Sequence, residues 1–152
     1  MKRFNLGQAI TILANVGVIA GIVFLGVELR QNTTASRLEA ASTHLAGSYE
    51  LDLLLATDED LSELLLTPEG ERSEVEQFQY ERFAFSVLRS WETSYFLYRQ
   101  SALDQEFWDA QAELIEGLLT GPFEQYWRTN QQVFTASFND VLSGIVENRP
   151  AQ

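Results

Sequence analysis

The residues whose types and spacing come closest to a chemical site lie between positions 89 and 108. Arg89, Glu92, Tyr95, Tyr98 and Arg99 lie at helical offsets of three and four. Read functionally, these side chains line a small polar or aromatic pocket for a ligand, with Trp91 or Trp108 as a wall. Read structurally, Arg89 and Glu92 form an i,i+3 ion pair worth roughly a few tenths of a kcal/mol, and the tyrosine hydroxyls reach solvent. We favour the structural interpretation.

Other kinds of catalytic chemistry lack the residues they need. His44 is the only histidine, and its nearest candidate partners in sequence are Glu39 and Ser48, without the repeated Glu-x-x-His elements of a diiron bundle. The absence of cysteine excludes thiol catalysis and thiolate metal sites. No nucleophile elbow, phosphate loop or dinucleotide fingerprint is present either. We expect no catalytic residue, no cofactor and no metal site, and interpret His44 as a surface or packing residue.

The charge balance argues against nucleic acid as a partner. The chain has 22 acidic and 10 basic residues, which give a formal net charge of -12. Nucleic acid and anionic lipid surfaces are bound through Lys and Arg, which displace counterions. The acidic residues are dense over 58–76, where they lack the Asp/Asn ladder and closing Glu of a calcium loop. We interpret that stretch as a solvated connection.

The N-terminal part of the chain has the pattern of a membrane segment. Between Ile10 and Val27 there is no charge, and only Thr11 and Asn15 carry polar side chains. A helix of about 20 residues crosses a hydrocarbon core of about 30 Å. Two alternatives stay open: a signal peptide, although charged residues follow in place of a cleavage site, and a buried core helix, although no polar stripe is visible. We expect a single-pass anchor in the inner membrane.

One face of this segment is expected to associate with another helix. Gly17 and Gly21 form a GxxxG pair, Ala14 lies close to the same face, and Asn15 is a candidate for a hydrogen bond across the contact. The expected partners are the lipid bilayer and either a second copy or another membrane protein. The alternative is that glycines are common in membrane helices and that water reaches Asn15 near one end. The basic residues on the two sides balance and leave the sidedness of the soluble part undetermined: Lys2, Arg3, Arg30 and Arg37.

Helix start and stop signals divide the remainder. Apolar residues recur every three or four positions up to a break at Thr57-Asp58, so the membrane helix is expected to run on into the soluble part. Ser73 and Glu76 form a capping box that opens a broadly apolar helix. Asp104 caps a further helix, and Gly121-Pro122 breaks and restarts the chain.

These signals predict an all-α protein in which a single N-terminal transmembrane helix continues into a small helical bundle. The expected anchor covers residues 1–30, and the acidic bundle covers residues 31–148. The helix that opens at the capping box has two apolar stripes, which favour a place in the middle of the bundle. Its stripes are Phe78, Phe85 and Leu88 on one side, and Tyr80, Phe83, Ala84, Val87, Trp91, Tyr95 and Tyr98 on another.

Several motifs together resemble a widespread family of uncharacterised small bacterial membrane proteins. The family pairs an apolar helix ending in a "YLAVQIRQNT"-like exit, here VFLGVELRQNT, with a helical domain of W-E-x-x-Y-Y-x-Y, L-D-x-x-x-W and P-G-x-x-x-x-W motifs. Phe96 replaces the second tyrosine, and Gly121-Pro122 reverses the Pro-Gly order. The resemblance implies an architecture and no activity. The matching residues are Trp91, Glu92, Tyr95, Tyr98, Leu103, Asp104, Trp108 and Trp127.

Three functional hypotheses follow. The first is a non-enzymatic anchored module that acts through protein contacts, as a homo-oligomer or as an accessory subunit of a membrane complex. The second is a membrane-tethered sensor in which a pocket near Tyr95 and Trp108 binds a small apolar or aromatic molecule. The third is an enzyme, which we place last because helical domains without histidine pairs, thiols or nucleotide motifs seldom carry out chemistry.

Overall fold

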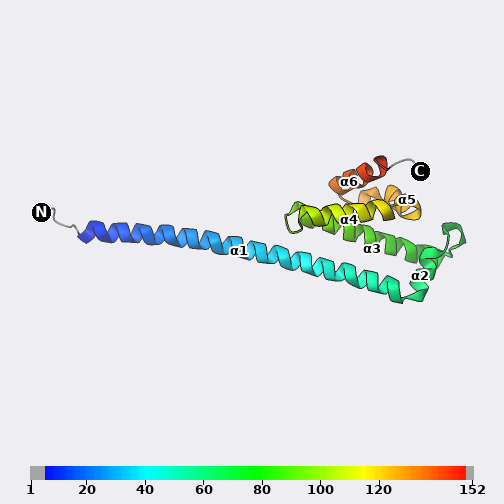
Figure 1. Cartoon of the computed structure of the whole chain (residues 1–152), viewed down its shortest axis with the longest axis horizontal. Helices are drawn as coiled ribbons and strands as arrows, with labels where there is room; N and C mark the ends of the chain where they lie inside the picture. The colour runs from blue at the N-terminus through cyan, green and yellow to red at the C-terminus, as the bar shows by residue number, and fades with distance from the viewer. Residues whose placement is uncertain (1–5, 150–152) are drawn as a thin grey trace. The chain divides into compact units, whose positions relative to one another are not determined.

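The computed structural model describes residues 6–149, which form helices joined by short connections without a strand among them (Figure 1). Internal contacts divide the chain into Met1–Leu38, here called the N-terminal unit, and Glu39–Gln152, the bundle unit. The predicted all-α class, with a long apolar N-terminal helix followed by a helical bundle, is confirmed. The elements are α1 (Leu6–Thr57), α2 (Glu59–Leu66), the 3-10 turn η1 (Glu69–Glu71), α3 (Glu74–Arg99), α4 (Gln105–Leu118), α5 (Gly121–Thr129), the 3-10 turn η2 (Gln131–Val133) and α6 (Ala136–Glu147).

The N-terminal unit contains the apolar part of α1. Its most apolar 18-residue window has a mean hydropathy of 2.4, and none of that window is buried. A helix of the protein core would be covered by its own chain, so the exposure argues against the buried-helix alternative and is compatible with a single-pass anchor or a signal sequence. Lys2 and Arg3, on which the orientation argument partly rests, lie outside the described residues.

The predicted continuation of the apolar helix is confirmed, because α1 runs without interruption to Thr57. The domain boundary expected after residue 30 therefore falls inside a helix, a little before the division at Leu38. Within the bundle unit, the last turns of α1 contribute to the hydrophobic packing. Ala41 is buried against Leu97 and Leu103, and Leu51 packs against the main core.

The acidic stretch 58–76 is more ordered than the solvated connection that we expected. Its first part forms α2, for which the Asp58 side chain accepts a hydrogen bond from the Leu61 backbone N–H at 2.9 Å. The cap satisfies one of the N–H groups that a helix start leaves open. Leu61, Leu64 and Leu65 then lie at helical spacing and reach the core, while the acidic residues of α2 are exposed: Glu59, Asp60 and Glu63. Local apolar periodicity thus prevails over the high charge density.

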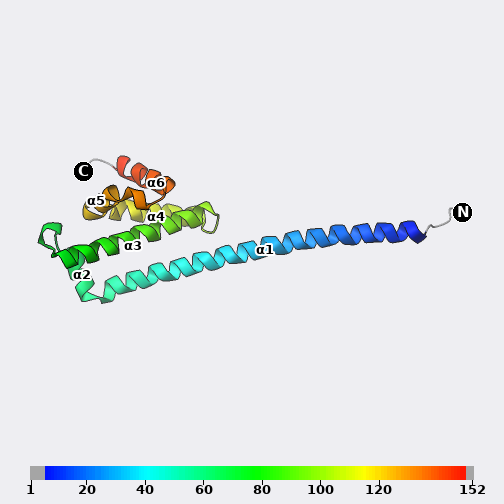
Figure 2. The same ribbon diagram turned by 180° about the vertical axis from the view of Figure 1, so that it is seen from behind.

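Helix α3 is the central element of the bundle unit. It opens with the predicted capping box, in which Ser73 and Glu76 each accept a hydrogen bond from the other's backbone N–H. It contacts α2, α4 and α5, and both views show α4 running alongside it (Figures 1 and 2). Phe78, assigned to an apolar stripe, is instead 62% exposed, and the Arg82 guanidinium lies over its ring. The buried residues of α3 are Tyr80, Ala84, Val87, Leu88, Trp91, Glu92, Ser94 and Leu97.

The helices α4 and α5 begin at signals that the sequence predicted, but the break between α5 and α6 was not predicted, because apolar residues continue at helical spacing across it. Asp104 caps α4 by accepting from the Phe107 backbone N–H at 2.8 Å, and Pro122 lies in the first turn of α5. Gly121 has a φ of +50°, a left-handed conformation that glycine adopts without strain, which explains why the chain turns there. The most completely buried residues of this C-terminal part belong to the main core: Ile115, Leu119, Trp127, Phe138 and Leu142.

Candidate functional site

The glycine pair of the N-terminal unit lies on an uncovered helix face. Apart from the neighbouring residues and backbone of its own helix, a Cβ atom added at Gly17 or at Gly21 would meet no described atom within 4 Å. At about 100° per residue these two positions differ by about 40° around the helix, and Ala14 lies about 20° from Gly21. Nothing among the described residues therefore requires glycine at either position. The face is flat enough for a second helix to approach closely.

Asn15 does not share that face. The same helical geometry turns Asn15 about 160° away from Gly17, onto the opposite side of α1. Asn15 is exposed there. The hydrogen bond that we predicted across the Gly17–Gly21 contact therefore has no geometric basis in this helix, because the amide points away from the helix that would approach the glycines.

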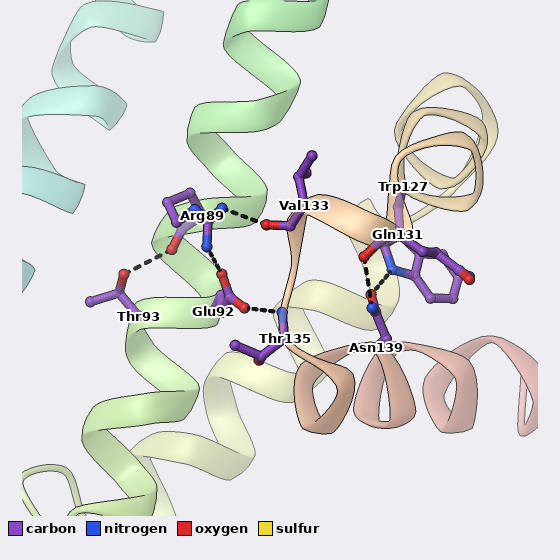
Figure 3. Close-up of polar contacts among 8 residues, drawn as sticks. All are labelled: Arg89, Glu92, Thr93, Trp127, Gln131, Val133, Thr135 and Asn139. Carbon is purple, nitrogen blue, oxygen red and sulfur yellow. Dashed lines mark hydrogen bonds and ion pairs between the residues drawn. The ribbon is translucent and has the colours of Figure 1, made fainter.

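Arg89 and Glu92 form the ion pair that the structural interpretation predicted, and each also binds a distant part of the chain (Figure 3). The Arg89 guanidinium donates a second hydrogen bond, 2.7 Å long, to the carbonyl oxygen of Val133. The other carboxylate oxygen of Glu92 accepts from the backbone N–H of Thr135, also at 2.7 Å. The pair thus holds the segment between η2 and α6 against α3. We call these four residues the polar clamp.

The clamp leaves Glu92 little capacity for chemistry. Glu92 is only 6% exposed, and both of its carboxylate oxygens already accept hydrogen bonds. A general base needs a lone pair directed at the substrate. The arrangement instead satisfies a buried charge with a partner cation and a backbone donor, which is the condition under which proteins retain buried charges.

A second polar contact fixes the same segment from its other side (Figure 3). The indole N–H of Trp127 donates to Asn139 Oδ1 at 2.9 Å, and Asn139 Nδ2 donates to the carbonyl of Gln131 at 2.9 Å. Trp127 is almost completely buried. One amide side chain therefore joins α5, η2 and α6, and with the polar clamp it holds the connection between α5 and α6.

The residues of the proposed ligand pocket do not all line one concavity. A shallow open depression of about 380 Å³ beside Thr135 is bordered by Arg89, Glu92, Tyr95 and Arg99, but not by Tyr98, Trp91 or Trp108. Trp108 is buried, with the Tyr95 ring centroid 5.2 Å from its own and the Tyr98 ring stacked on it at 5.5 Å. The aromatic rings thus fill the space between α3 and α4 with each other. Their packing is the kind expected of core aromatic pairs.

A more enclosed cavity of about 280 Å³ lies elsewhere in the bundle unit. Its walls come from α1, α2, α3, α4 and α5, and most of the side chains are apolar. No sequence pattern predicts this cavity, because its residues are ordinary core positions that are far apart along the chain. The lining residues are Ser48, Leu51, Asp52, Leu55, Leu65, Phe83, Val87, Ser90, Trp91, Gln111, Leu114, Leu118 and Phe123.

His44 pairs with Ser94, a residue that belongs to no recognisable sequence motif. Its Nε2 lies 2.7 Å from Ser94 Oγ, across a separation of 50 residues, and the Ser94 side chain is buried. Burial lowers the pKa of His44 below its ordinary value of 6.5. Because Ser94 is only 3% exposed, a substrate cannot approach its hydroxyl, and the pair joins α1 to α3 as a packing contact.

Among residues 6–149, no three His, Cys, Asp or Glu side chains are grouped so that they could hold a metal ion. Comparisons of the chain with models of protein families, with curated proteins and with solved structures found no match. The resemblance drawn from the sequence motifs therefore stays a proposal.

Proposed function

We propose that this protein is a single-pass membrane-anchored helical module that acts through protein contacts and self-associates through the Gly17–Gly21 face of α1. Residues 10–27 would span the inner membrane, and the bundle unit would stand in the adjoining aqueous compartment. No catalytic activity is part of this proposal. We also propose that the protein belongs to the family of small bacterial membrane proteins that its motifs resemble.

The observation that carries this proposal is the uncovered glycine pair in an exposed apolar helix. A glycine inside a helix costs roughly 1 kcal/mol relative to alanine. Gly17 and Gly21 have open space where a Cβ would lie, so nothing in the described chain offsets that cost. Close approach of a second helix offsets it, because association in lipid depends on van der Waals packing between small residues.

The soluble end of α1 gives a second reason to expect protein contacts. Leu51 and Leu55 line the cavity of the bundle unit, whereas Tyr49 and Leu53 lie on the opposite side of the helix and are 70% and 51% exposed. A helix that ends against one core needs only one apolar face. Large apolar side chains on its outer face are typical of a surface that meets another protein.

The experiment is a measurement of self-association of the full chain in lipid vesicles. Two labelled populations, one carrying a donor and one an acceptor fluorophore, are mixed, and energy transfer is followed as lipid dilutes the protein. Gly17→Leu and Gly21→Leu should each raise the dissociation constant roughly tenfold, which corresponds to about 1.4 kcal/mol. The mass of the protein purified from native membranes should include the N-terminal segment. That mass would exclude cleavage of a signal sequence.

Gly26→Leu is the matched control. Gly26 also has nothing within 4 Å of an added Cβ, but it lies about 180° from Gly17 around α1. It should leave the dissociation constant unchanged. Equal effects of all three substitutions, or a strict monomer at every lipid ratio, would contradict self-association through this face. A monomer that co-purifies with one larger complex would instead assign the accessory-subunit role.

A further inference from the structure

The cavity of the bundle unit has an aromatic wall. Phe83, Trp91 and Phe123 line it together, with the Phe123 ring centroid 6.0 Å from that of Phe83 and 6.3 Å from that of Trp91. Leucines from α1, α2 and α4 supply most of the remaining apolar surface. An apolar cavity of roughly 150 Å³ is large enough for benzene. The 280 Å³ here therefore accommodates one ring with a short polar substituent.

The polar groups of the cavity include several acceptors. Ser48, Asp52, Ser90 and Gln111 are the polar lining residues, and among residues 6–149 no Lys, Arg or His is part of the lining. The Ser48 hydroxyl donates to the His44 carbonyl at 3.2 Å and lies 3.3 Å from Ser90 Oγ. Each hydroxyl oxygen keeps lone-pair capacity, since an oxygen of this kind has two acceptor positions. The lining thus offers acceptors to a donor group, with the Asp52 carboxylate as its only acceptor-only side chain.

The charge of the lining selects among ligands. Asp52 is the only charged residue there, and the whole chain has a formal net charge of -12. A carboxylate or phosphate would meet repulsion from Asp52 and no compensating cation. An ammonium group would pair with Asp52, and it suits a cavity with an aromatic wall because aromatic faces attract cations. The remaining neutral acceptors suit the N–H donors of the same group.

We propose that this cavity binds a small amphipathic amine, with an aromatic or short apolar body against the Phe83, Trp91 and Phe123 wall and a cationic amino group at Asp52. This inference is independent of the proposed self-association, since it concerns the bundle unit alone. It also differs from the pocket expected near Tyr95 and Trp108, whose space the aromatic rings fill.

The test uses three probes that share one ring and differ in charge: benzylamine, benzyl alcohol and benzoate. Each is titrated into the full chain in lipid nanodiscs, with empty nanodiscs as the blank, and binding is read by saturation-transfer NMR. Benzylamine should bind more tightly than benzyl alcohol, by about three- to fivefold, because the contact with Asp52 is partly exposed. Benzoate should bind least.

Two variants locate the site. Leu114→Trp places a larger side chain at a half-exposed rim position and should remove benzylamine binding, whereas Leu66→Trp, at an 84% exposed leucine outside the cavity, should retain it. Asp52→Asn should reduce benzylamine affinity to that of the alcohol while leaving alcohol binding unchanged.

Three results would overturn the assignment: no binding of benzylamine, equal affinities for benzylamine and benzoate, or retained binding in Leu114→Trp. Circular dichroism of each variant shows whether the helical content is that of the native protein. Because Asp52→Asn changes only an exposed side chain, it keeps the test informative if the tryptophan variant unfolds.

Discussion

The backbone N–H of Thr135 donates a 2.7 Å hydrogen bond to the carboxylate of Glu92, which lies 43 residues earlier in the chain and is almost completely buried. Through this bond a charged side chain of the central helix fixes the start of the last helix. An isolated α3 could form the i,i+3 pair of Arg89 with Glu92, but the contact with Thr135 forms only when the bundle unit folds. It makes Glu92 a structural residue of the whole bundle unit.

Replacing Glu92 should therefore cost more than an exposed ion pair. We expect Glu92→Gln to reduce the free energy of unfolding by about 1–3 kcal/mol, because the buried contacts with Arg89 and Thr135 lose a charge-assisted acceptor. Urea unfolding followed by circular dichroism measures the change. Glu116→Gln, at an exposed carboxylate of α4, is the control and should stay within about 0.5 kcal/mol of the native value. Equal behaviour of the two variants would contradict the role of the clamp.

Substitution of Asn139 should destabilise the protein about as much as substitution of Glu92. Asn139→Ala removes both the acceptor of the buried Trp127 indole N–H and the donor to the Gln131 carbonyl. We expect a loss of about 1–3 kcal/mol, since a buried indole N–H then lacks its partner. Thermal unfolding followed by tryptophan fluorescence is the measurement. Asn148→Ala is the control, because Asn148 bonds only within its own helix end and is exposed. A native-like melting temperature for Asn139→Ala would show that water replaces the lost contacts.

How far the sequence predicted these features depends on whether their causes are local. The capping box of Ser73 and Glu76 and the cap at Asp104 act within one helix turn, and both were identified from spacing alone. The Arg89–Glu92 pair was likewise readable as an i,i+3 contact. Helix α2 was not predicted, because its high density of acidic residues outweighed the helical spacing of its leucines.

Long-range contacts were beyond sequence reasoning for a physical reason. The bonds from Glu92 to Thr135 and from His44 to Ser94 join residues 43 and 50 positions apart, and their formation depends on how the helices pack. No local rule specifies that packing. The cavity was missed for the same reason, since it is made by ordinary apolar residues such as Leu51 and Phe123 that only the fold brings together.

His44 should make stability depend on pH. Burial lowers its pKa below 6.5 in the folded chain, so the unfolded chain binds a proton at higher pH than the folded chain does. The contribution of neutral His44 to stability is then fully present above about pH 6.5. It is lost as the pH decreases from the pKa of His44 in the unfolded chain to its pKa in the folded chain. His44→Gln, which keeps a polar group near Ser94, should show a smaller decrease in melting temperature between pH 7.5 and pH 5.5. An unchanged pH profile in the variant would contradict this origin.

Asn15 provides a test of which face of α1 associates. Because it lies about 160° from Gly17, Asn15→Leu should change the dissociation constant of the self-associated form by less than about twofold. The measurement is the same energy transfer in vesicles that tests Gly17→Leu. If Asn15→Leu weakened self-association as much as the glycine variants do, the helices would meet through the Asn15 side. Interhelical hydrogen bonds there would contribute about 1 kcal/mol.

The continuity of α1 determines where this protein can be divided. A fragment that begins at Asp58, the first break in the helices, would lack the Ala41 packing, the His44–Ser94 bond and one wall of the cavity. A fragment that begins at Glu39 would retain all three, because they belong to the bundle unit. Proteolytic separation of a folded bundle unit from the apolar segment therefore requires cleavage within a continuous helix, and a protease that acts on exposed loops would find no such site between the apolar segment and Thr57.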